Sequence, residues 1–239
     1  MDTSKIKLIA FDLDGTITQH KTPPTPENKE TLVRLSKKYK LLMVGAGQVR
    51  RIFDQLEKFP IDIIGNYGLQ EGIYDHEKND IVIIRDEKID CDRENIDEKI
   101  TFLRNKYGFT EFAGDNTEFH PSGCITFPIL GTKARQEDKL AFDPDRVKRR
   151  KIYADVCDTF ADYSVFVGGS SSFDMAPKPY NKYYALDRYC EKSGLGHDEV
   201  VFVGDDYGLG GNDESVYLSD FNFIKVDDYR EFANILSIL

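Results

Sequence analysis

Two aspartates separated by one residue, Asp12 and Asp14, are the side chains of this sequence best suited to chemistry. They follow an apolar run at residues 6–11, and such a run predicts a buried strand. Open α/β sheets bind their ligands at the carboxyl ends of strands, and residues i and i+2 of a strand point the same way. Two carboxylates crowded together repel each other, and a cation or a shared proton relieves that repulsion. Taken alone, the pattern also fits an ordinary strand followed by an Asp-Gly turn.

Three further segments fall where predicted strands end or the following helices begin. One is a glycine turn whose backbone N–H groups could hold a phosphate at a helix start. Another is a lysine at the start of a helix, and the third is an acidic, glycine-rich loop. Each has an ordinary interpretation, but carboxylates from separate strands, a lysine and a glycine turn at one sheet edge together predict a Mg²⁺–phosphate site. The residues concerned are Gly45, Ala46, Gly47, Gln48, Lys182, Asp205 and Asp213.

Strand and helix patterns alternate at both ends of the chain, which predicts a parallel sheet with right-handed crossovers. The helix patterns in these parts are confined to a few short segments, each next to an apolar strand pattern. The predicted elements are helices at 26–38, 49–58, 182–192 and 228–236, with strands at 6–11, 40–44, 61–64, 199–203 and 222–226.

The middle of the chain has a different character. A hairpin pattern at 71–84 is followed by helix patterns at 94–106 and 145–160 and by strand patterns at 117–128 and 164–175. The predicted fold is therefore α/β: a Rossmann-like, doubly wound, mostly parallel core sheet formed by residues 1–84 and 179–239. Residues 85–178 would form an inserted α+β domain.

Composition excludes several classes of protein. The net charge of −10 over 239 residues disfavours a nucleic-acid partner. No apolar stretch approaches the roughly 18 residues that span a membrane, and the N-terminal residues lack the apolar region of a signal peptide. The four cysteines form no C-x-x-C motif and are expected to be free thiols. We therefore expect a cytoplasmic protein with no membrane partner.

The order of these motifs resembles the haloacid-dehalogenase (HAD) superfamily of phosphoryl-transfer enzymes. The string Phe-Asp-Leu-Asp-Gly-Thr at 11–16, the glycine turn, the lysine, and Gly-Asp followed by Gly-Gly-Asn-Asp within 204–213 match in sequence order. The chain looks most like eukaryotic-type phosphomannomutases, which carry a large α+β cap of type C2b (subfamily IIB). The string Gly-Gly-Ser-Ser-Ser-Phe-Asp at 168–174 is similar to theirs. The resemblance covers most of the chain.

The resemblance implies a role for each matching residue. Asp12 would be the nucleophile that forms an aspartyl-phosphate, and Asp14 the general acid and base. Mg²⁺ would be held by Asp12, by Asp14 through its carbonyl, by Asp205, and by Asp213 in or near the shell. Lys182 would balance the charge of the phosphoryl oxygens and of Asp12. The inserted domain would be the substrate-specificity cap, where Ser172 and Asp174 match residues that hold sugar hydroxyls in the family. Lys133 and Arg135, as cations close to the altered cap strands, are the other residues expected to bind substrate.

The sequence departs from the family pattern at two places. Gly47, followed by Gln48, stands where the second motif normally carries Ser or Thr, so one phosphate hydrogen bond is lost or Gln48 supplies it. Thr132 stands where the family has an arginine after Pro-Ile-Gly, and His20-Lys21 where it has an arginine after the first motif. His120, Lys133 and Arg135 are the cations left near the altered cap strands. Forked arginines suit a second phosphate, so the altered cap favours water over a sugar as acceptor.

We therefore expect a Mg²⁺-dependent phosphatase acting on a small phosphorylated metabolite, such as a sugar phosphate. The alternative is a phosphomannomutase that interconverts mannose 1-phosphate and mannose 6-phosphate. A third interpretation, favoured by Gly47, is a catalytically weak relative that only binds a phosphometabolite. The chain would be a monomer or a homodimer formed through its cap.

Overall fold

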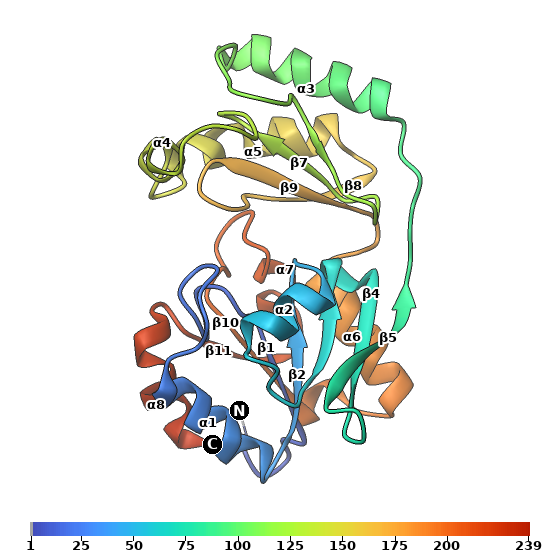
Figure 1. Cartoon of the computed structure of the whole chain (residues 1–239), viewed down its shortest axis with the longest axis vertical. Helices are drawn as coiled ribbons and strands as arrows, with labels where there is room; N and C mark the ends of the chain where they lie inside the picture. The colour runs from blue at the N-terminus through green and yellow to red at the C-terminus, as the bar shows by residue number, and fades with distance from the viewer. Residues whose placement is uncertain (1) are drawn as a thin grey trace. The chain divides into compact units, whose positions relative to one another are not determined.

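Figure 1 shows the computed structural model, which describes residues 2–239. Contacts divide the chain into two compact units. Unit 1 comprises Met1–Glu87, Asn181–Gly208 and Asp213–Leu239, and unit 2 comprises Lys88–Tyr180 and Leu209–Asn212. The chain passes between the units within three residues of the positions expected from the sequence, 84/85 and 178/179. Residues 209–212 are assigned to unit 2, although the segments before and after them belong to unit 1. No sequence pattern indicated this assignment.

Unit 1 is built on a seven-stranded sheet with the order β11-β10-β1-β2-β3-β4-β5. The five strands from β11 to β3 are parallel, β4 is antiparallel to β3, and β5 is antiparallel to β4. The mostly parallel α/β core predicted from the alternating patterns is therefore present. The strands are β1 (Leu8–Phe11), β2 (Lys40–Val44), β3 (Asp62–Gly65), β4 (Gln70–Asp75), β5 (Asp80–Asp86), β10 (Val200–Gly204) and β11 (Asn222–Lys225).

Helices cover both faces of this sheet, because its central strands alternate side chains between two apolar clusters. One cluster joins Ile9 and Met43 of the sheet to α1 (Pro26–Ser36), α2 (Val49–Gln55) and α8 (Phe232–Ile235). The other joins Leu8 and Leu42 to α6 (Lys182–Ser193) and α7 (Glu214–Tyr217). The sheet is thus held between two helical layers, and the strand ends of β1, β2 and β10 are fixed relative to each other.

Helix ends in unit 1 follow local signals. Thr25 caps α1 by accepting a hydrogen bond from Asn28 N, with Pro26 at the first helical position. Asn181 caps α6 by accepting from Tyr184 N, and Gly194 ends this helix in the left-handed conformation. The helix predicted at 228–236 is instead broken into η3 (Tyr229–Glu231), α8 and η4 (Leu236–Ile238). Each of these segments is only about one turn long, so the single continuous helix predicted here is wrong.

Unit 2 has a four-stranded antiparallel sheet with the order β6-β7-β9-β8. Its core combines sheet residues such as Phe127 and Phe173 with apolar residues of α3 and α5. Helix α4 follows the sequence Thr-Lys-Ala-Arg and buries no residue, which is why no amphipathic pattern predicted it. The elements are α3 (Arg93–Tyr107), β6 (Glu118–Phe119), β7 (Ile125–Pro128), α4 (Gln136–Phe142), α5 (Val147–Thr159), β8 (Tyr163–Phe166) and β9 (Ser172–Pro177).

Two findings bear on the surroundings of the protein. None of the helices within residues 2–239 is both long enough and apolar enough to cross a bilayer. The four cysteines are free thiols, and Cys124 and Cys190 are buried.

Candidate active site

A buried lysine joins two aspartates in unit 1. Lys182, the first residue of α6, is fully buried, and its Nζ donates to Asp12 Oδ1 at 2.5 Å and to Asp213 Oδ1 at 2.7 Å. Asp12 directly follows β1, and its backbone N–H donates to Val203 O of β10 at 2.9 Å. Segments 170 residues apart in sequence therefore converge on one ammonium group.

The charge of this lysine is fixed by its neighbours. Burial acts to lower the pKa of Lys182, but the charges of Asp12 and Asp213 and their hydrogen bonds outweigh it and hold the pKa above its ordinary value. Lys182 is therefore a permanent cation in the interior. An interpretation of Lys182 as an ordinary surface lysine, which the sequence left open, does not apply.

Three carboxylates meet beside the lysine. Asp12, Asp205 and Asp213 each offer an oxygen, and these atoms lie within 4.8 Å of one another. Burial first, and then the charges of Asp12 and Asp213, raise the pKa of Asp205 to about 8. Burial and Asp12 likewise raise the pKa of Asp213 to about 6, although Lys182 opposes the rise. Carboxylates that are buried and mutually repulsive gain most from a divalent cation, so the cluster fits Mg²⁺.

Two glycines allow the backbone to approach this cluster. Gly15 has a φ of +98°, and a Cβ placed on it would lie 2.4 Å from Asp205 Oδ2. A Cβ on Gly204, the last residue of β10, would lie 2.5 Å from Asp213 Oδ2. Any side chain at either position would displace a carboxylate, because 2.5 Å is far inside van der Waals contact.

The three carboxylates differ in how many oxygens the protein already engages. Asp213 uses both, since Oδ1 accepts from Lys182 and Oδ2 accepts from Asp206 N at 3.0 Å. Asp205 Oδ1 accepts from Thr16 Oγ1 at 2.9 Å. Asp12 Oδ2 and Asp205 Oδ2 are therefore the oxygens best placed for direct contact with a cation. Asp213 is better suited to hold Lys182 and to close its own loop.

Asp14 lies in a different environment from Asp12. Strand β1 ends at Phe11, and Asp14 belongs to a turn that is bridged to Thr18, so the alternation of a strand does not apply to the pair. Its carboxylate is held apart from the cluster of Asp12, Asp205 and Asp213. Asp14 Oδ1 accepts from Lys21 N and from Gln55 Nε2, both at 2.7 Å. The side chain of Asp14 is thus oriented as a separate, half-buried acid.

Basic groups surround the other oxygen of Asp14. Arg51 Nη1 lies 3.5 Å from Asp14 Oδ2, and His20 Nδ1 lies 3.9 Å from it. Arg51 belongs to α2, and its Nη1 also donates to Gln55 Oε1 at 2.7 Å. Sequence patterns did not single out Arg51, Gln55 or Thr16. The helical spacing of Arg51 and Gln55 is the one sequence signal that could have placed them on a common face.

The glycine turn lies between β2 and α2, as expected. Gly47 O accepts from Asn66 N at 2.8 Å, and Gly45 O accepts from Tyr67 N at 3.2 Å, which fixes the turn against the end of β3. Val49 N is already bonded to Gln70 Oε1 at 2.7 Å. Ala46 lies within this turn, and Gln48 is the residue before α2, but its side chain does not cap the helix within the described chain. The phosphate-binding role of the turn stays a prediction.

The cap residues predicted to bind substrate divide into two groups. Ser172 and Asp174 lie on β9, where Ser172 Oγ donates to Gly168 O at 3.1 Å and Asp174 Oδ1 accepts from Thr126 Oγ1 at 2.9 Å. Burial raises the pKa of Asp174. His120 Nε2 is 3.1 Å from the same Thr126 hydroxyl, so a polar chain runs from His120 to Asp174.

Lys133 and Arg135 lie before α4 and are exposed. Arg135 makes a fork to Asp138, with Nε–Oδ2 and Nη2–Oδ1 distances of 2.8 Å. Its guanidinium therefore has a carboxylate partner on its own helix. A role in binding substrate stays a prediction for both residues.

A buried arginine supports the β8–β9 loop. Arg149 of α5 donates through Nη1 to Gly168 O at 2.5 Å and to Ser172 O at 3.0 Å, while its Nε bonds Asp143 Oδ2 at 2.8 Å. A Cβ at Gly168 would lie 1.9 Å from Asp174 Oδ2, so this position must be glycine for the loop to pass Asp174. The backbone around Ser172 is thus held rigidly by unit 2 itself.

The core sheet, the inserted α+β unit and the carboxylate–lysine cluster define an enzyme fold of the HAD superfamily. Solved structures with this fold include a haloacid dehalogenase-like hydrolase from Bacillus subtilis, with a TM-score of 0.64 at 16% identity over 98% of this chain and 100% of that one. A HAD phosphatase from Bacteroides thetaiotaomicron has a TM-score of 0.61 at 15% identity, over 100% and 96% of the two chains.

Sequence comparison assigns the family. The family model of eukaryotic phosphomannomutases matches residues 28–226, and the chain belongs to this family. Curated relatives include a phosphomannomutase from Triticum aestivum, 29% identical over 89% of this chain and 86% of that protein. A phosphomannomutase from Arabidopsis thaliana is 28% identical over 87% and 86%. The resemblance noted in the sequence is therefore confirmed.

Proposed function

We propose that this protein catalyses Mg²⁺-dependent phosphoryl transfer through an aspartyl-phosphate on Asp12, with water as the acceptor and a small phosphorylated metabolite as the substrate. The observation that carries the proposal is the hydrogen bond from Lys182 Nζ to Asp12 Oδ1, with Asp205 and Asp213 beside it. The lysine places a positive charge against the Asp12 carboxylate in a buried site. An ionised carboxylate at the end of β1 is the nucleophile that this chemistry requires.

Each chemical step has a residue available for it. The carboxylate of Asp12 attacks phosphorus and forms an acyl-phosphate bond, while the bond from phosphorus to the substrate oxygen breaks. Asp14 is the residue available to give a proton to the leaving oxygen. Asp14 then accepts a proton from water as the water oxygen attacks phosphorus, which releases inorganic phosphate and regenerates Asp12.

Charge must be neutralised for an anionic nucleophile to approach an anionic ester. Repulsion at 4 Å is about 4 kcal/mol per pair of charges at an effective dielectric of 20. Lys182 supplies one positive charge through its contact with Asp12 Oδ1. Asp12 Oδ2 and Asp205 Oδ2 would hold the Mg²⁺ ion. When bound, Mg²⁺ supplies Lewis-acid neutralisation of the phosphoryl oxygens. Arg51 adds a further cation beside Asp14.

The proposal that water is the phosphoryl acceptor rests on the cationic residues of the cap. A sugar bisphosphate needs a second phosphate clamp, and forked arginines suit that task. Here Thr132 replaces one family arginine, and Arg135 is already forked to Asp138. These features favour water as the acceptor and hydrolysis as the net reaction. A cytoplasmic location is proposed as well, supported by the free thiols, which are typical of a reducing compartment.

A phosphomannomutase activity is the second candidate, favoured by the match of the family model to residues 28–226. The polar chain His120–Thr126–Asp174 supports it, since it provides hydroxyl- and charge-binding groups on β7 and β9. A protein of this kind would be a monomer or a homodimer formed through the cap.

Two assays distinguish these functions. Hydrolysis of p-nitrophenyl phosphate and of a panel of sugar phosphates is measured with Mg²⁺, for the native chain, for Asp12→Asn and for the control Asp75→Asn. Asp75 is a hairpin carboxylate paired with Lys78. We expect hydrolysis in the native chain and the control, and its loss in Asp12→Asn. Absence of phosphate release from every ester would refute the phosphatase proposal.

The second assay supplies mannose 1-phosphate together with a hexose bisphosphate primer. Formation of mannose 6-phosphate faster than release of inorganic phosphate would replace hydrolysis by the mutase reaction. Lack of turnover in both assays, with binding of the sugar phosphate retained, would identify a relative that binds without catalysis.

A further inference from the structure

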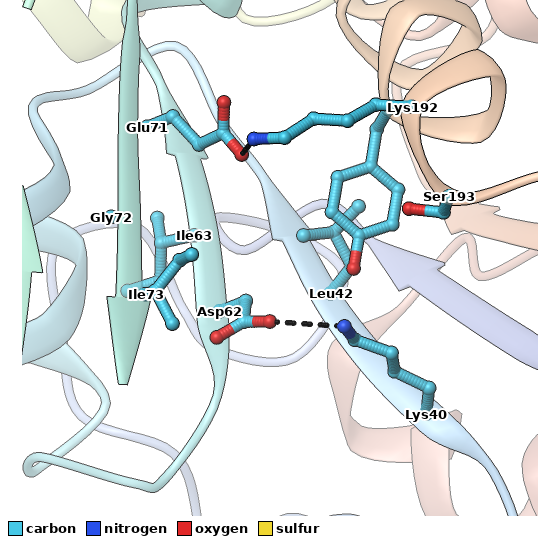
Figure 2. A pocket seen from close by; sticks show the side chains of 10 residues that line it. Lys40, Leu42, Asp62, Ile63, Glu71, Gly72, Ile73, Lys192 and Ser193 are labelled. Carbon is cyan, nitrogen blue, oxygen red and sulfur yellow. Dashed lines mark hydrogen bonds and ion pairs between the residues drawn. The ribbon is translucent and has the colours of Figure 1, made fainter. Parts of the chain in front are cut away.

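A second cavity lies in unit 1, away from the carboxylate cluster. It has a volume of about 150 Å³ and lies between the last turn of α6 and the sheet strands β2, β3 and β4 (Figure 2). Lys40 in its wall pairs with Leu8, the first residue of β1, whereas Asp12 follows the last residue of β1. The part of the cavity at Lys40 therefore lies at the opposite strand ends from the candidate active site. Its lining comprises Lys40, Leu42, Asp62, Ile63, Glu71, Gly72, Ile73, Tyr189, Lys192 and Ser193.

Tyr189 in this lining has an unused polar group. The side chain is 8% exposed, and its buried hydroxyl makes no hydrogen bond of good geometry within residues 2–239. Lys40 and Ser193 lie close enough to lower the pKa of this phenol, but burial outweighs them and raises it. A buried hydroxyl without a partner costs about 1–3 kcal/mol, so folding alone gives no reason to keep an oxygen there. Phenylalanine would fill the same volume without that cost.

Two ion pairs flank the phenol, and they occupy every carboxylate oxygen of the cavity. Asp62 Oδ2 is 3.3 Å from Lys40 Nζ, and Asp62 Oδ1 accepts from Tyr74 N at 3.1 Å. Glu71 Oε1 is 3.1 Å from Lys192 Nζ, and Glu71 Oε2 is 3.3 Å from Arg85 Nε. Figure 2 shows the Lys192–Glu71 pair above the Lys40–Asp62 pair, with both lysines reaching their carboxylates from the same side.

Donors are consequently in excess. Each ammonium group carries three protons and uses one of them on its carboxylate. The phenol adds another donor. The charges themselves balance, because Lys40 and Lys192 face Asp62 and Glu71, and Arg85 outside the lining is shared between Glu71 and Glu87. A ligand that satisfies the surplus donors accepts hydrogen bonds, and an oxyanion is the strongest acceptor for them.

Most of the remaining wall is apolar, and the polar residue Ser193 completes it. Leu42 and Ile63 belong to the lining, as does Ile73, which is 41% exposed. A cavity of about 150 Å³ holds a ring of roughly six heavy atoms. A short organic chain with one anionic end matches both the volume and the division into a charged and an apolar side.

We propose that the cavity between α6 and strands β2–β4 binds a small organic oxyanion, whose charged end is held by Lys40, Lys192 and the hydroxyl of Tyr189. The apolar part lies against Leu42 and Ile73. A carboxylate and a phosphate share this chemistry, and the apolar wall favours a monocarboxylate of about four to six heavy atoms. The site is independent of the proposed phosphoryl transfer.

The test uses the full chain, freed of metal with a chelator so that the carboxylate cluster does not take up anions. Isobutyrate, propionate and inorganic phosphate are titrated by calorimetry, with isobutyramide as the uncharged control. Backbone amide NMR shifts of β2, β4 and the end of α6 report the location. We expect isobutyrate to bind, isobutyramide not to bind, and shifts to gather around these elements.

Two variants test the proposed anion contacts. Tyr189→Phe is expected to raise the Kd for the anion about tenfold, because one charge-assisted hydrogen bond is lost. Without ligand its Tm should equal or exceed that of the native chain, since an unpaired buried hydroxyl is removed. Lys192→Gln should weaken binding similarly. Lys29→Gln, which breaks the exposed pair with Glu57 at 2.7 Å, is the matched control and should bind normally.

Three outcomes would overturn the proposal. One is lack of binding by all three anions up to about 10 mM, a limit that six well-placed heavy atoms should exceed. Another is binding that Tyr189→Phe leaves unchanged. The last is phosphate binding alone that disappears in Asp12→Asn, which would assign the anion to the carboxylate cluster. A lower Tm of Tyr189→Phe with unchanged affinity would show that the phenol is structural.

Discussion

The guanidinium of Arg51 occupies the space that a side chain at position 47 would need. A Cβ built on Gly47 would lie 2.2 Å from Arg51 Nη2 and 2.5 Å from Arg51 Nε. The family's second motif normally carries a serine or threonine at this position. Here the hydroxyl is absent, and the guanidinium of Arg51 lies in its place. Arg51 also lies 3.5 Å from Asp14, within the surroundings of the candidate active site.

The first prediction concerns this exchange. Arg51→Ala should lower kcat/KM for phosphate esters about tenfold or more, because a hydrogen bond to a charged group contributes roughly 1.5–3 kcal/mol. Adding Gly47→Ser to Arg51→Ala should restore part of the loss, since the space for a hydroxyl is then free. Steady-state kinetics of both variants measure this.

Arg50→Ala provides the control, because Arg50 lies on the same helix and pairs with the exposed Asp80. It should leave kcat/KM unchanged. Equal activity of Arg51→Ala and the native chain would contradict this prediction and show that Arg51 does not contribute to turnover.

A second prediction concerns the buried lysine. Lys182→Met leaves Asp12 and Asp213 without their shared cation in a site that solvent does not reach. Removing one partner of a buried pair costs about 3–5 kcal/mol, so urea unfolding should show a loss of that order. Hydrolysis should be abolished. Since the cluster becomes more negative, Mg²⁺ should raise the Tm of Lys182→Met by more than it raises that of the native chain.

An equal effect of Mg²⁺ on both proteins would show that the cation binds elsewhere. Lys178→Met is a suitable comparison, since it is the other lysine close in sequence and is exposed. It should keep the stability of the native chain.

The sequence predicted the core sheet well because parallel strands are buried on both faces and read as short apolar runs, as in β1 and β10. It also placed Asp12, Asp205 and Asp213 at strand ends, where the structure brings their oxygens together. It did not indicate that Lys182 is fully buried, because burial of a lysine depends on partners 31 and 170 residues away. The same holds for Arg51, whose proximity to Gly47 is a property of the folded turn. Helix α4 was not predicted, because it buries no residue and therefore has no amphipathic pattern.

A third prediction follows from the pKa of Asp205. Burial and neighbouring charge raise this pKa to about 8, whereas its ordinary value is 3.8. A carboxyl group whose pKa is raised by folding stabilises the folded state at pH below its unfolded value, and this contribution is lost as pH rises through the folded value. In a chelator, the free energy of unfolding should therefore fall between about pH 4 and pH 8. Mg²⁺ should restore it, and the increase in Tm caused by Mg²⁺ should grow across the same range.

Asp205→Asn should remove most of this dependence, because the amide does not ionise. Its Tm without metal should vary less with pH than that of the native chain. A Tm increase with Mg²⁺ that is as large at pH 5 as at pH 8 would contradict the prediction.

The last prediction concerns a histidine outside the candidate active site. His197 lies between two carboxylates, with Nδ1 2.7 Å from Asp220 Oδ1 and Nε2 2.9 Å from Asp187 Oδ1, and its ring stacks on Phe221 with centroids 3.8 Å apart. Burial acts to lower the pKa of His197, but the hydrogen bonds to Asp220 and Asp187 outweigh it and raise the pKa above 6.5. A raised histidine pKa stabilises the fold below pH 6.5, and the contribution is lost as pH rises through the folded value.

His197→Gln should lower Tm at pH 6 but have little effect at pH 9, with a difference on the order of 1–2 °C because the pair is largely solvent-screened. Thermal unfolding at low salt measures it, with His76→Gln on the β4–β5 hairpin as the control. A Tm loss of equal size at both pH values would assign the effect to ring stacking on Phe221 instead of charge.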